Sequence, residues 1–219
     1  MKSLLLLPAL ILLLASCRQP NAGQVQVISS KLDTSLIPKN VKYKGSIDTA
    51  VKFTDKDGEH VILTTEDDAI DTGHRQTGVY LHAYCYTIKY NKWAPSWQLY
   101  DYTDECEFDI SGGFLAKTFA ITDLNHDGKA EVWLIYNLAC RSDVSPSDVK
   151  IIMHEGSKKY ALRGNSRVKV NATDYYGGDY KFDGAFKHGP KEFMEYAKQL
   201  WNRNLNEGFD EAHPAGKFN

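Results

Sequence analysis

Hydrophobic and polar residues alternate over several stretches of this chain, which is the pattern of β-strands that bury one face. The longest alternating stretch covers residues 79–90, where Val79, Leu81 and Ala83 share one face with Cys85. The chain is therefore predicted to be mainly β. Further strands are expected at residues 41–53, 61–65, 96–102, 117–122, 132–138, 149–154 and 159–162.

Polar segments with turn-forming residues separate these strands. Residues 54–58 and 155–157 place glycine beside acidic residues and predict tight hairpins, and residues 91–92 predict a third turn. Residues 66–78 are polar and acidic and predict a long loop. Residues 171–184 are rich in Tyr, Gly and Asp and predict irregular structure.

One helix is predicted near the C-terminus. Pro190 suits its first turn, and Gly208 can end it. Apolar residues recur between them with helical spacing, so we expect the helix to pack on one side of the sheet. This apolar stripe comprises Phe193, Met194, Ala197, Leu200, Trp201 and Leu205. Residues 209–219 are expected to form a flexible tail.

The start of the chain has the features of a secretory signal. Lys2 precedes an apolar run over residues 4–14, which is too short to remain as a membrane span. The run ends in Leu-Ala-Ser-Cys, which resembles a bacterial lipobox. The resemblance implies removal of residues 1–16, acylation of Cys17, for example with palmitate, and attachment to a membrane by lipid. A simple signal peptide with an incidental cysteine is the alternative.

The mature chain is predicted to contain a tether and one domain. Residues 17–36 are polar, include Pro20 and Gly23, and lack a sustained apolar pattern, as in a flexible linker. Residues 37–208 are enough for one domain with a substantial core. Arg18 follows the cysteine where an acidic residue would mark inner-membrane retention in many Gram-negative lipoproteins. Sorting to the outer membrane, on its periplasmic or its outer face, is therefore expected.

The charge of the chain argues against nucleic acid as a partner. Twenty-six Lys and Arg residues and 28 Asp and Glu residues give a formal net charge of −2. Removal of residues 1–16 takes away Lys2 alone among the charged residues and leaves −3. Proteins that bind nucleic acid normally present a basic surface.

Residues 123–131 have the composition of a calcium-binding loop. Calcium prefers six to eight oxygen ligands, and Gly128 permits the sharp turn that brings such ligands together. Several carboxylates at this spacing would repel one another without a cation between them. The predicted ligands of Ca²⁺ are the side chains of Asp123, Asn125, Asp127 and Glu131 and the carbonyl of Lys129. A hairpin turn without an ion is the alternative, because Asn, Asp and Gly favour turns.

These nine positions resemble the calcium loop of FG-GAP and VCBS repeats and of integrin α-chain blades. An EF-hand is excluded, because its twelfth position needs a bidentate acid and Leu134 stands there. Residues 53–61 echo residues 124–132 in sequence. The resemblance implies two blade-like antiparallel β units with a C-terminal α-helix packed on the sheet. The alternative is that the two segments are unrelated hairpins.

Four cysteines suggest one disulfide in an oxidising compartment. With Cys17 acylated, Cys85, Cys106 and Cys140 remain. We predict the pair Cys106–Cys140, because both lie at apparent strand ends, whereas Cys85 belongs to a buried strand face.

A set of aromatic residues lies on the other face of the strand over residues 79–90. It comprises Tyr80, His82, Tyr84 and Tyr86. Such a face can stack on sugar rings and donate hydrogen bonds to them, which makes these residues candidates for ligand binding. Alternatively, they pack against the terminal helix or another strand.

Three segments together resemble a family of bacterial envelope lipoproteins sometimes labelled surface-polysaccharide biosynthesis proteins. They are residues 121–131, 138–146 and 159–164. The resemblance implies a role in surface polysaccharide and assigns no reaction. No nucleophile elbow, phosphate loop or dinucleotide fingerprint is present, so no catalytic residue is predicted.

We therefore expect a lipid-anchored, non-enzymatic envelope protein that binds or handles surface glycan. Two alternatives stay open. One is a glycan hydrolase or transferase with acids from residues 66–71 or 104–109, and the other is a subunit of an envelope protein assembly.

Overall fold

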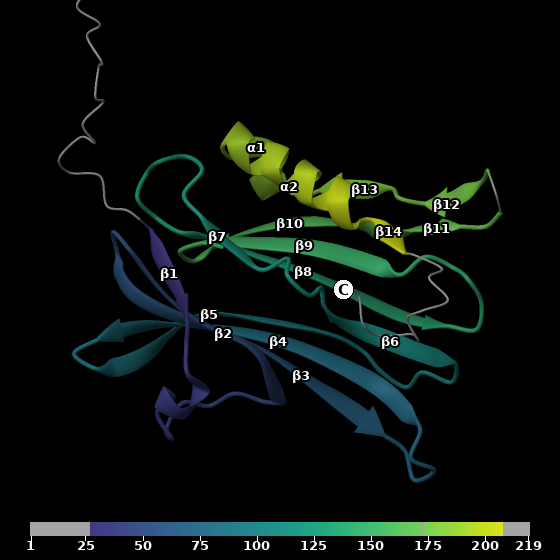
Figure 1. Cartoon of the computed structure of the whole chain (residues 1–219), viewed down its shortest axis with the longest axis horizontal. Helices are drawn as coiled ribbons and strands as arrows, with labels where there is room; N and C mark the ends of the chain where they lie inside the picture. The colour runs from purple at the N-terminus through teal and green to yellow at the C-terminus, as the bar shows by residue number, and fades with distance from the viewer. Residues whose placement is uncertain (1–26, 172, 208–219) are drawn as a thin grey trace, which may run out of the picture.

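The computed structural model describes residues 27–171 and 173–207. The predicted signal peptide, the lipidated Cys17, Gly208 and the predicted tail at residues 209–219 lie outside the described residues. Within the described part, no helix has the length and apolar character needed to cross a membrane. The described chain forms two large antiparallel sheets with helices over one of them (Figure 1).

The first sheet, sheet A, is an antiparallel meander in the order β1-β2-β3-β4-β5. Its strands are β1 (Ile28–Lys31), β2 (Ser46–Asp55), β3 (Gly58–Ile70), β4 (Gln76–Lys89) and β5 (Lys92–Thr103). Tyr90 and Asn91 both have positive φ, 51° and 59°, which matches the right-handed twist of a tight hairpin. The long loop predicted at residues 66–78 is wrong, because β3 and β4 pair as far as Ile70 and Gln76. The backbone pairing of two neighbouring strands overrides the polar composition there.

The second sheet, sheet B, has the order β13-β10-β9-β8-β6, and β7 also pairs with β8. Its strands are β6 (Asp109–Phe114), β7 (Ala120–Thr122), β8 (Glu131–Arg141), β9 (Asp148–Glu155), β10 (Lys158–Asn165) and β13 (Tyr180–Phe182). Strand β7 is shorter than predicted, because Lys117 lies in a turn with φ 61°.

The predicted irregular segment at residues 171–184 contains regular elements. A small third sheet joins β11 (Arg167–Lys169), β12 (Tyr175–Gly177) and β14 (Asn206–Glu207). The described residues include the helical elements η1 (Thr34–Leu36), α1 (Gly184–His188) and α2 (Lys191–Asn204). The predicted C-terminal helix is therefore confirmed, with Pro190 at its N-cap and Leu205 at its C-cap.

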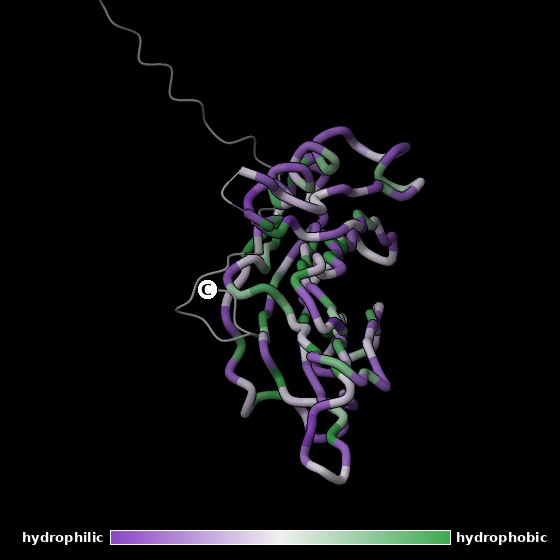
Figure 2. Tube along the Cα trace, turned by 90° about the vertical axis from the view of Figure 1, so that its right-hand side faces the viewer, coloured by the Kyte–Doolittle hydropathy of each residue, from purple (hydrophilic) through white to green (hydrophobic). Residues whose placement is uncertain are grey.

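Apolar side chains fill two interfaces, one on each side of sheet B. Residues of β8 alternate between them, so that Val132 and Leu134 face sheet A while Trp133 and Ile135 face the helices. The helix side is closed by Phe193 of α2 and by other members of the predicted apolar stripe. Figure 2 shows hydrophobic positions along the strands of both sheets and polar positions at the turns. The prediction of a mainly β fold with a C-terminal helix packed on the sheet is confirmed.

The N-terminal segment contradicts the predicted tether over residues 17–36 in its described part. Strand β1 pairs with β2, and Leu32 is buried. Together with Ile37 and Val41, Leu32 packs on the outer face of sheet A near Leu63. The segment is held because isolated apolar residues find a ready-made apolar surface, which a sequence window does not reveal.

Candidate functional site

The predicted calcium loop joins β7 to β8 at the end of sheet B. Strand pairing places Thr122 directly opposite Glu131 at the base of the loop. Glu131 is fully buried and accepts hydrogen bonds from Thr122 Oγ1 (2.7 Å) and from Leu124 N (2.9 and 3.1 Å). Burial raises the pKa of Glu131, although these hydrogen bonds oppose the rise. Both carboxylate oxygens of Glu131 therefore hold the loop closed.

Side-chain oxygens also shape the turn of this loop. Asp123 Oδ2 accepts from Gly128 N (3.1 Å), Asn125 Oδ1 from Asp127 N (3.1 Å), and Asp127 Oδ1 from Lys129 N (2.7 Å). Gly128 has φ 83°, a value that glycine adopts without steric cost. In the described part of the chain, the other oxygen of Asp123, Oδ1, is buried and has no hydrogen-bond partner.

The β2–β3 turn lies directly against this loop. Lys56 N donates to Gly128 O (2.9 Å), and Lys56 Nζ contacts the carbonyl and the carboxylate of Asp127. A second ion pair joins Lys129 Nζ to Asp57 Oδ2 (3.2 Å). The two segments with similar sequences, residues 53–61 and 124–132, are therefore brought into contact with each other.

The predicted calcium ligands fit the ion in part. The buried Oδ1 of Asp123, which has no hydrogen-bond partner among the described residues, offers one oxygen to a cation. The Glu131 carboxylate accepts hydrogen bonds from Leu124 N of the loop backbone, and Asn125 Nδ2 donates to Glu155 Oε1 (2.9 Å). The described residues contain no cluster of three or more His, Cys, Asp or Glu side chains arranged to hold a metal. Calcium at this loop stays a prediction.

The predicted aromatic residues of β4 lie on the outer face of sheet A, and the N-terminal segment covers one of them, Tyr86. Tyr86 is buried, and its hydroxyl donates to Lys42 O (2.8 Å). The hydroxyl of Tyr84 accepts from Lys44 N (3.2 Å). The N-terminal segment thus covers Tyr86, which is removed from the candidate ligand-binding set because that segment occupies its face.

Two tyrosines of the edge strand β5 extend this aromatic surface. Strand pairing places Tyr100 opposite His82 and Tyr102 opposite Tyr80. The ring centroids are 4.9 Å apart for His82–Tyr100, 5.9 Å for Tyr80–Tyr102 and 5.2 Å for Tyr100–Tyr102, all nearly parallel. Tyr100 and Tyr102 are 55% and 52% exposed. We call Tyr80, His82, Tyr84, Tyr100 and Tyr102 the aromatic ladder; His82 is only 7% exposed, so the tyrosines supply the surface that a ligand could reach.

The sequence predicted the strand over residues 96–102 but not which of its faces carries Tyr100 and Tyr102. The register set by the tight turn would place Tyr100 opposite Leu81, on the inner face. A register shift between Cys85 and Tyr86 moves Tyr100 opposite His82 and so places both tyrosine rings on the outer face. Trp97, two positions before Leu99, falls on the inner face instead and stacks on His154 at 3.9 Å.

Polar groups border the aromatic ladder. A hydrogen bond with Asp104 raises the pKa of Tyr80 to about 12, and the same bond lowers the pKa of Asp104. Asp67 of β3 lies opposite Tyr80 in the strand pairing. Burial, and then the charge of Lys44, lowers the pKa of His82. The surface therefore combines flat rings with carboxylates that accept hydrogen bonds.

The predicted disulfide pair is the one present in the structure. Cys106 and Cys140 are bonded, with their Cα atoms 5.8 Å apart. The bond attaches the segment after β5 to β8 of sheet B. Cys85 is a buried free cysteine, and burial raises the pKa of its thiol to about 12.

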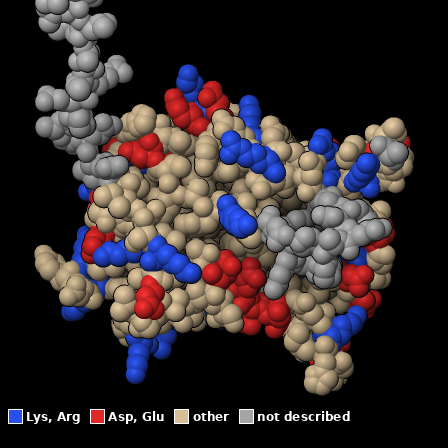
Figure 3. All heavy atoms as spheres, in the orientation of Figure 1, with Lys and Arg blue, Asp and Glu red and all other residues tan. Residues whose placement is uncertain are grey.

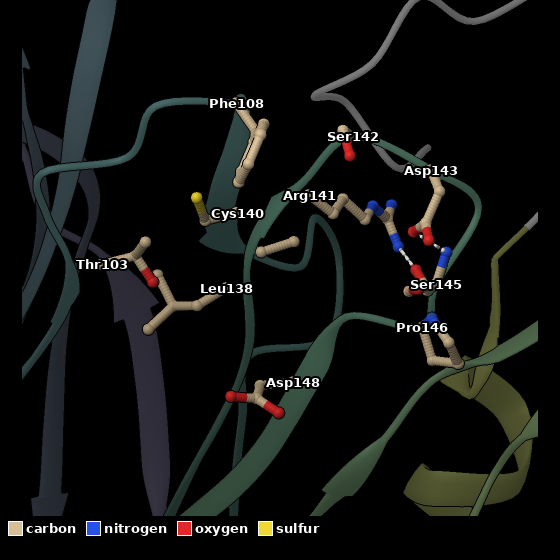
Figure 4. A pocket seen from close by; sticks show the side chains of 11 residues that line it. Thr103, Phe108, Leu138, Cys140, Arg141, Ser142, Asp143, Ser145, Pro146 and Asp148 are labelled. Atoms are coloured by element: carbon tan, nitrogen blue, oxygen red, sulfur yellow. Dashed lines mark hydrogen bonds between the residues drawn. The ribbon is translucent and has the colours of Figure 1, made fainter.

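A shallow polar hollow of about 510 Å³ lies beside this disulfide. Its lining includes Arg141, Asp143 and Asp148. Figure 4 shows the Arg141 side chain extended toward Ser145, whose backbone N–H donates to Asp143 Oδ1 (2.9 Å). These polar groups hold the β8–β9 loop in shape.

The acids of the alternative hydrolase hypothesis have local structural roles. Figure 3 shows acidic side chains gathered over the region of β3 and β4. Glu66 Oε1 accepts from Phe114 N (2.8 Å), and burial raises the pKa of Glu66. Asp71 Oδ1 accepts from Gly73 N and Arg75 N (2.9 and 2.8 Å). None of the acids from residues 66–71 or 104–109 lines this hollow.

Comparison with known proteins adds nothing to this picture: no family model, no curated protein and no solved structure matches the chain.

Proposed function

We propose that this chain is a non-enzymatic cell-envelope protein that binds glycan through the aromatic ladder. One observation carries the proposal: two half-exposed tyrosines, Tyr100 and Tyr102, continue a set of parallel rings on a flat sheet face. Tyrosine rings present an apolar face to a sugar ring and a hydroxyl to its substituents. The carboxylates of Asp67 and Asp104 beside the rings are acceptors for sugar hydroxyls.

The location of the protein belongs to the same proposal. The sequence before the described residues resembles a lipoprotein signal, so acylated Cys17 would attach the chain to the outer membrane. Calcium at residues 123–131 would act structurally, because the loop lies at the contact between the two sheets. Asp123, Asp127 and the Lys129 carbonyl would supply its oxygens, and the ion would neutralise their charge.

Affinity electrophoresis of the mature chain tests glycan binding. Native gels would contain dextran, xylan, laminarin, hyaluronate or polygalacturonate, and retardation would be measured with and without calcium. We expect retardation by at least one polysaccharide. The double variant Tyr100→Ala, Tyr102→Ala should weaken that binding at least about tenfold, because each ring–sugar contact contributes about 1 kcal/mol.

Tyr90→Ala is the matched control, because Tyr90 is 98% exposed at the tip of the β4–β5 hairpin and outside the ladder. This variant should bind as the natural chain does. Equal thermal unfolding temperatures of both variants would show that the fold is kept. Equal retardation of the ladder variant and the natural chain, or no retardation by any polysaccharide, would refute the proposal.

A further inference from the structure

Three basic side chains form a row across neighbouring strands of sheet B. Strand pairing places Arg163 of β10 opposite Lys150 of β9 on one side and Lys181 of β13 on the other. Adjacent strands are about 4.8 Å apart, so the three side chains lie close together on one face. It is the face that carries Ile152, which packs between the sheets. We call Lys150, Arg163 and Lys181 the basic row.

Sheet A covers only part of this face. Its edge strand β5 reaches as far as β9, where Asp101 accepts from Tyr136 OH (2.8 Å) and pairs with Lys150 Nζ (2.5 Å). Sheet A has no described strand beyond β5, so β10 and β13 project past its edge. Arg163 and Lys181 are accordingly exposed.

The basic row has more positive charge than the surrounding residues neutralise. Like charges directly opposite each other on paired strands destabilise a sheet. Asp101 neutralises Lys150, but within residues 27–171 and 173–207 neither Arg163 nor Lys181 forms an ion pair. Burial, and then the charges of Arg163 and Lys150, lowers the pKa of the neighbouring Lys159.

Asp183, another acid near the basic row, already accepts hydrogen bonds from the backbone. Asp183, whose charge favours the charged form of Lys159, accepts hydrogen bonds from Ala161 N (3.0 Å) and Phe186 N (2.9 Å). An anion from outside the chain would therefore relieve the repulsion within the row. Arginine suits this role, because its planar guanidinium forms two parallel hydrogen bonds with a carboxylate or sulfate.

The row and the aromatic ladder lie on opposite sides of the same edge strand. Asp101 points inward to Lys150, whereas its chain neighbours Tyr100 and Tyr102 belong to the ladder. We propose that the basic row binds the acidic groups of a polysaccharide whose sugar rings contact the ladder. This inference rests on the proposed function and narrows its ligand to acidic glycan.

Fluorescence anisotropy with labelled polygalacturonate tests the row in the mature chain, with labelled dextran as the neutral probe. The variant Arg163→Gln, Lys181→Gln should bind polygalacturonate at least about tenfold more weakly, and its binding should lose most of its salt dependence. Binding of dextran should stay within about twofold. Lys31→Gln with Lys89→Gln removes the same charge from exposed positions of sheet A and should leave both affinities unchanged.

Each of the remaining outcomes rejects the inference. An unchanged affinity of the row variant for polygalacturonate would overturn the inference, and loss of dextran binding in the ladder variant would show that the proposed function stands without it. Equal binding of the natural chain to duplex DNA or phosphatidylglycerol vesicles, lost in the row variant, would show an unspecific response to polyanions. Failure of every polysaccharide to bind would overturn the proposed function itself and the inference with it.

Discussion

Asp55 Oδ2 accepts a hydrogen bond from Ala130 N at 3.0 Å, across 75 positions of the chain. The other oxygen of this buried carboxylate accepts from Asp57 N (2.8 Å) and contacts His60 Nε2 (3.0 Å). One side chain therefore fixes its own β2–β3 turn and also attaches that turn to the predicted calcium loop. The two sheets are joined at this point by polar bonds as well as by apolar packing.

The first prediction concerns this carboxylate. Burial favours the neutral form of Asp55, but hydrogen bonds from His60, Ala130 and Asp57 outweigh it and leave the pKa below 3.8. Its stabilising effect is thus present above pH 3.8 and is lost as the pH falls through the folded-state pKa. Asp55→Asn should lower the free energy of unfolding by about 2 kcal/mol at pH 7.

Urea unfolding of both chains at several pH values measures this effect. The difference between them should shrink below pH 4. Asp57→Asn is the control, because it breaks only the half-exposed ion pair with Lys129 and should cost less than about 1 kcal/mol. A loss for Asp55→Asn no larger than that of the control would contradict the bridging role.

The second prediction concerns His154, which is buried between the sheets and stacks on Trp97. Burial, and then the charge of Lys159, lowers the pKa of His154 from 6.5 to about 4. His154 therefore becomes protonated near pH 6.5 in the unfolded chain but only near pH 4 in the folded chain. Stability is lost as the pH falls through this window, by at most about 3 kcal/mol.

His154→Phe keeps the stacked ring and removes the titrating group. The variant should lose less stability than the natural chain between pH 7 and pH 4.5, as measured by urea unfolding. His74→Phe, in the exposed β3–β4 turn, should keep the natural pH dependence. Identical pH profiles for His154→Phe and the natural chain would count against a neutral buried histidine.

The third prediction tests calcium at residues 123–131. With a dissociation constant of about 1 mM, 10 mM calcium should stabilise the fold by about 1.4 kcal/mol and raise its unfolding temperature. Asp123→Asn should abolish this response. Lys56→Met should strengthen it, because the Lys56 ammonium contacts the Asp127 oxygens that calcium would use. Differential scanning calorimetry with and without EDTA is the measurement. An unchanged unfolding temperature in the natural chain would contradict calcium binding and support the alternative, a turn without an ion.

The fourth prediction concerns the cysteines. Replacing both Cys106 and Cys140 by Ser should lower the free energy of unfolding by about 3–4 kcal/mol, because the disulfide closes a loop with a sequence separation of 34. Cys85→Ala keeps the bond and serves as the control. Mass spectrometry after iodoacetamide treatment should find Cys85 unmodified in the folded chain and modified in urea, since its thiol is buried and protonated. Rapid modification under native conditions would show that β4 opens.

The sequence by itself determined the elements that depend on neighbours along the chain. Alternation indicated the central parts of β2, β3, β4, β5, β8, β9 and β10, helical spacing defined α2, and the position of Cys106 and Cys140 at apparent strand ends indicated their disulfide. These features are local because hydrogen bonds within a hairpin or helix, and burial of one face, follow a fixed period. The apolar face of β4 was predicted for the same reason.

Only the tertiary structure decided which parts of each face meet another segment. Tyr86 is covered because residues 42–44 cross its face, whereas Tyr100 stays open because β5 is an edge strand. Arg163 acquires two cationic neighbours through the pairing of β10 with β9 and β13, and sheet A ends before reaching it. Contacts of this kind depend on the register and stacking of segments far apart in the chain, and periodicity within a short window does not contain that information.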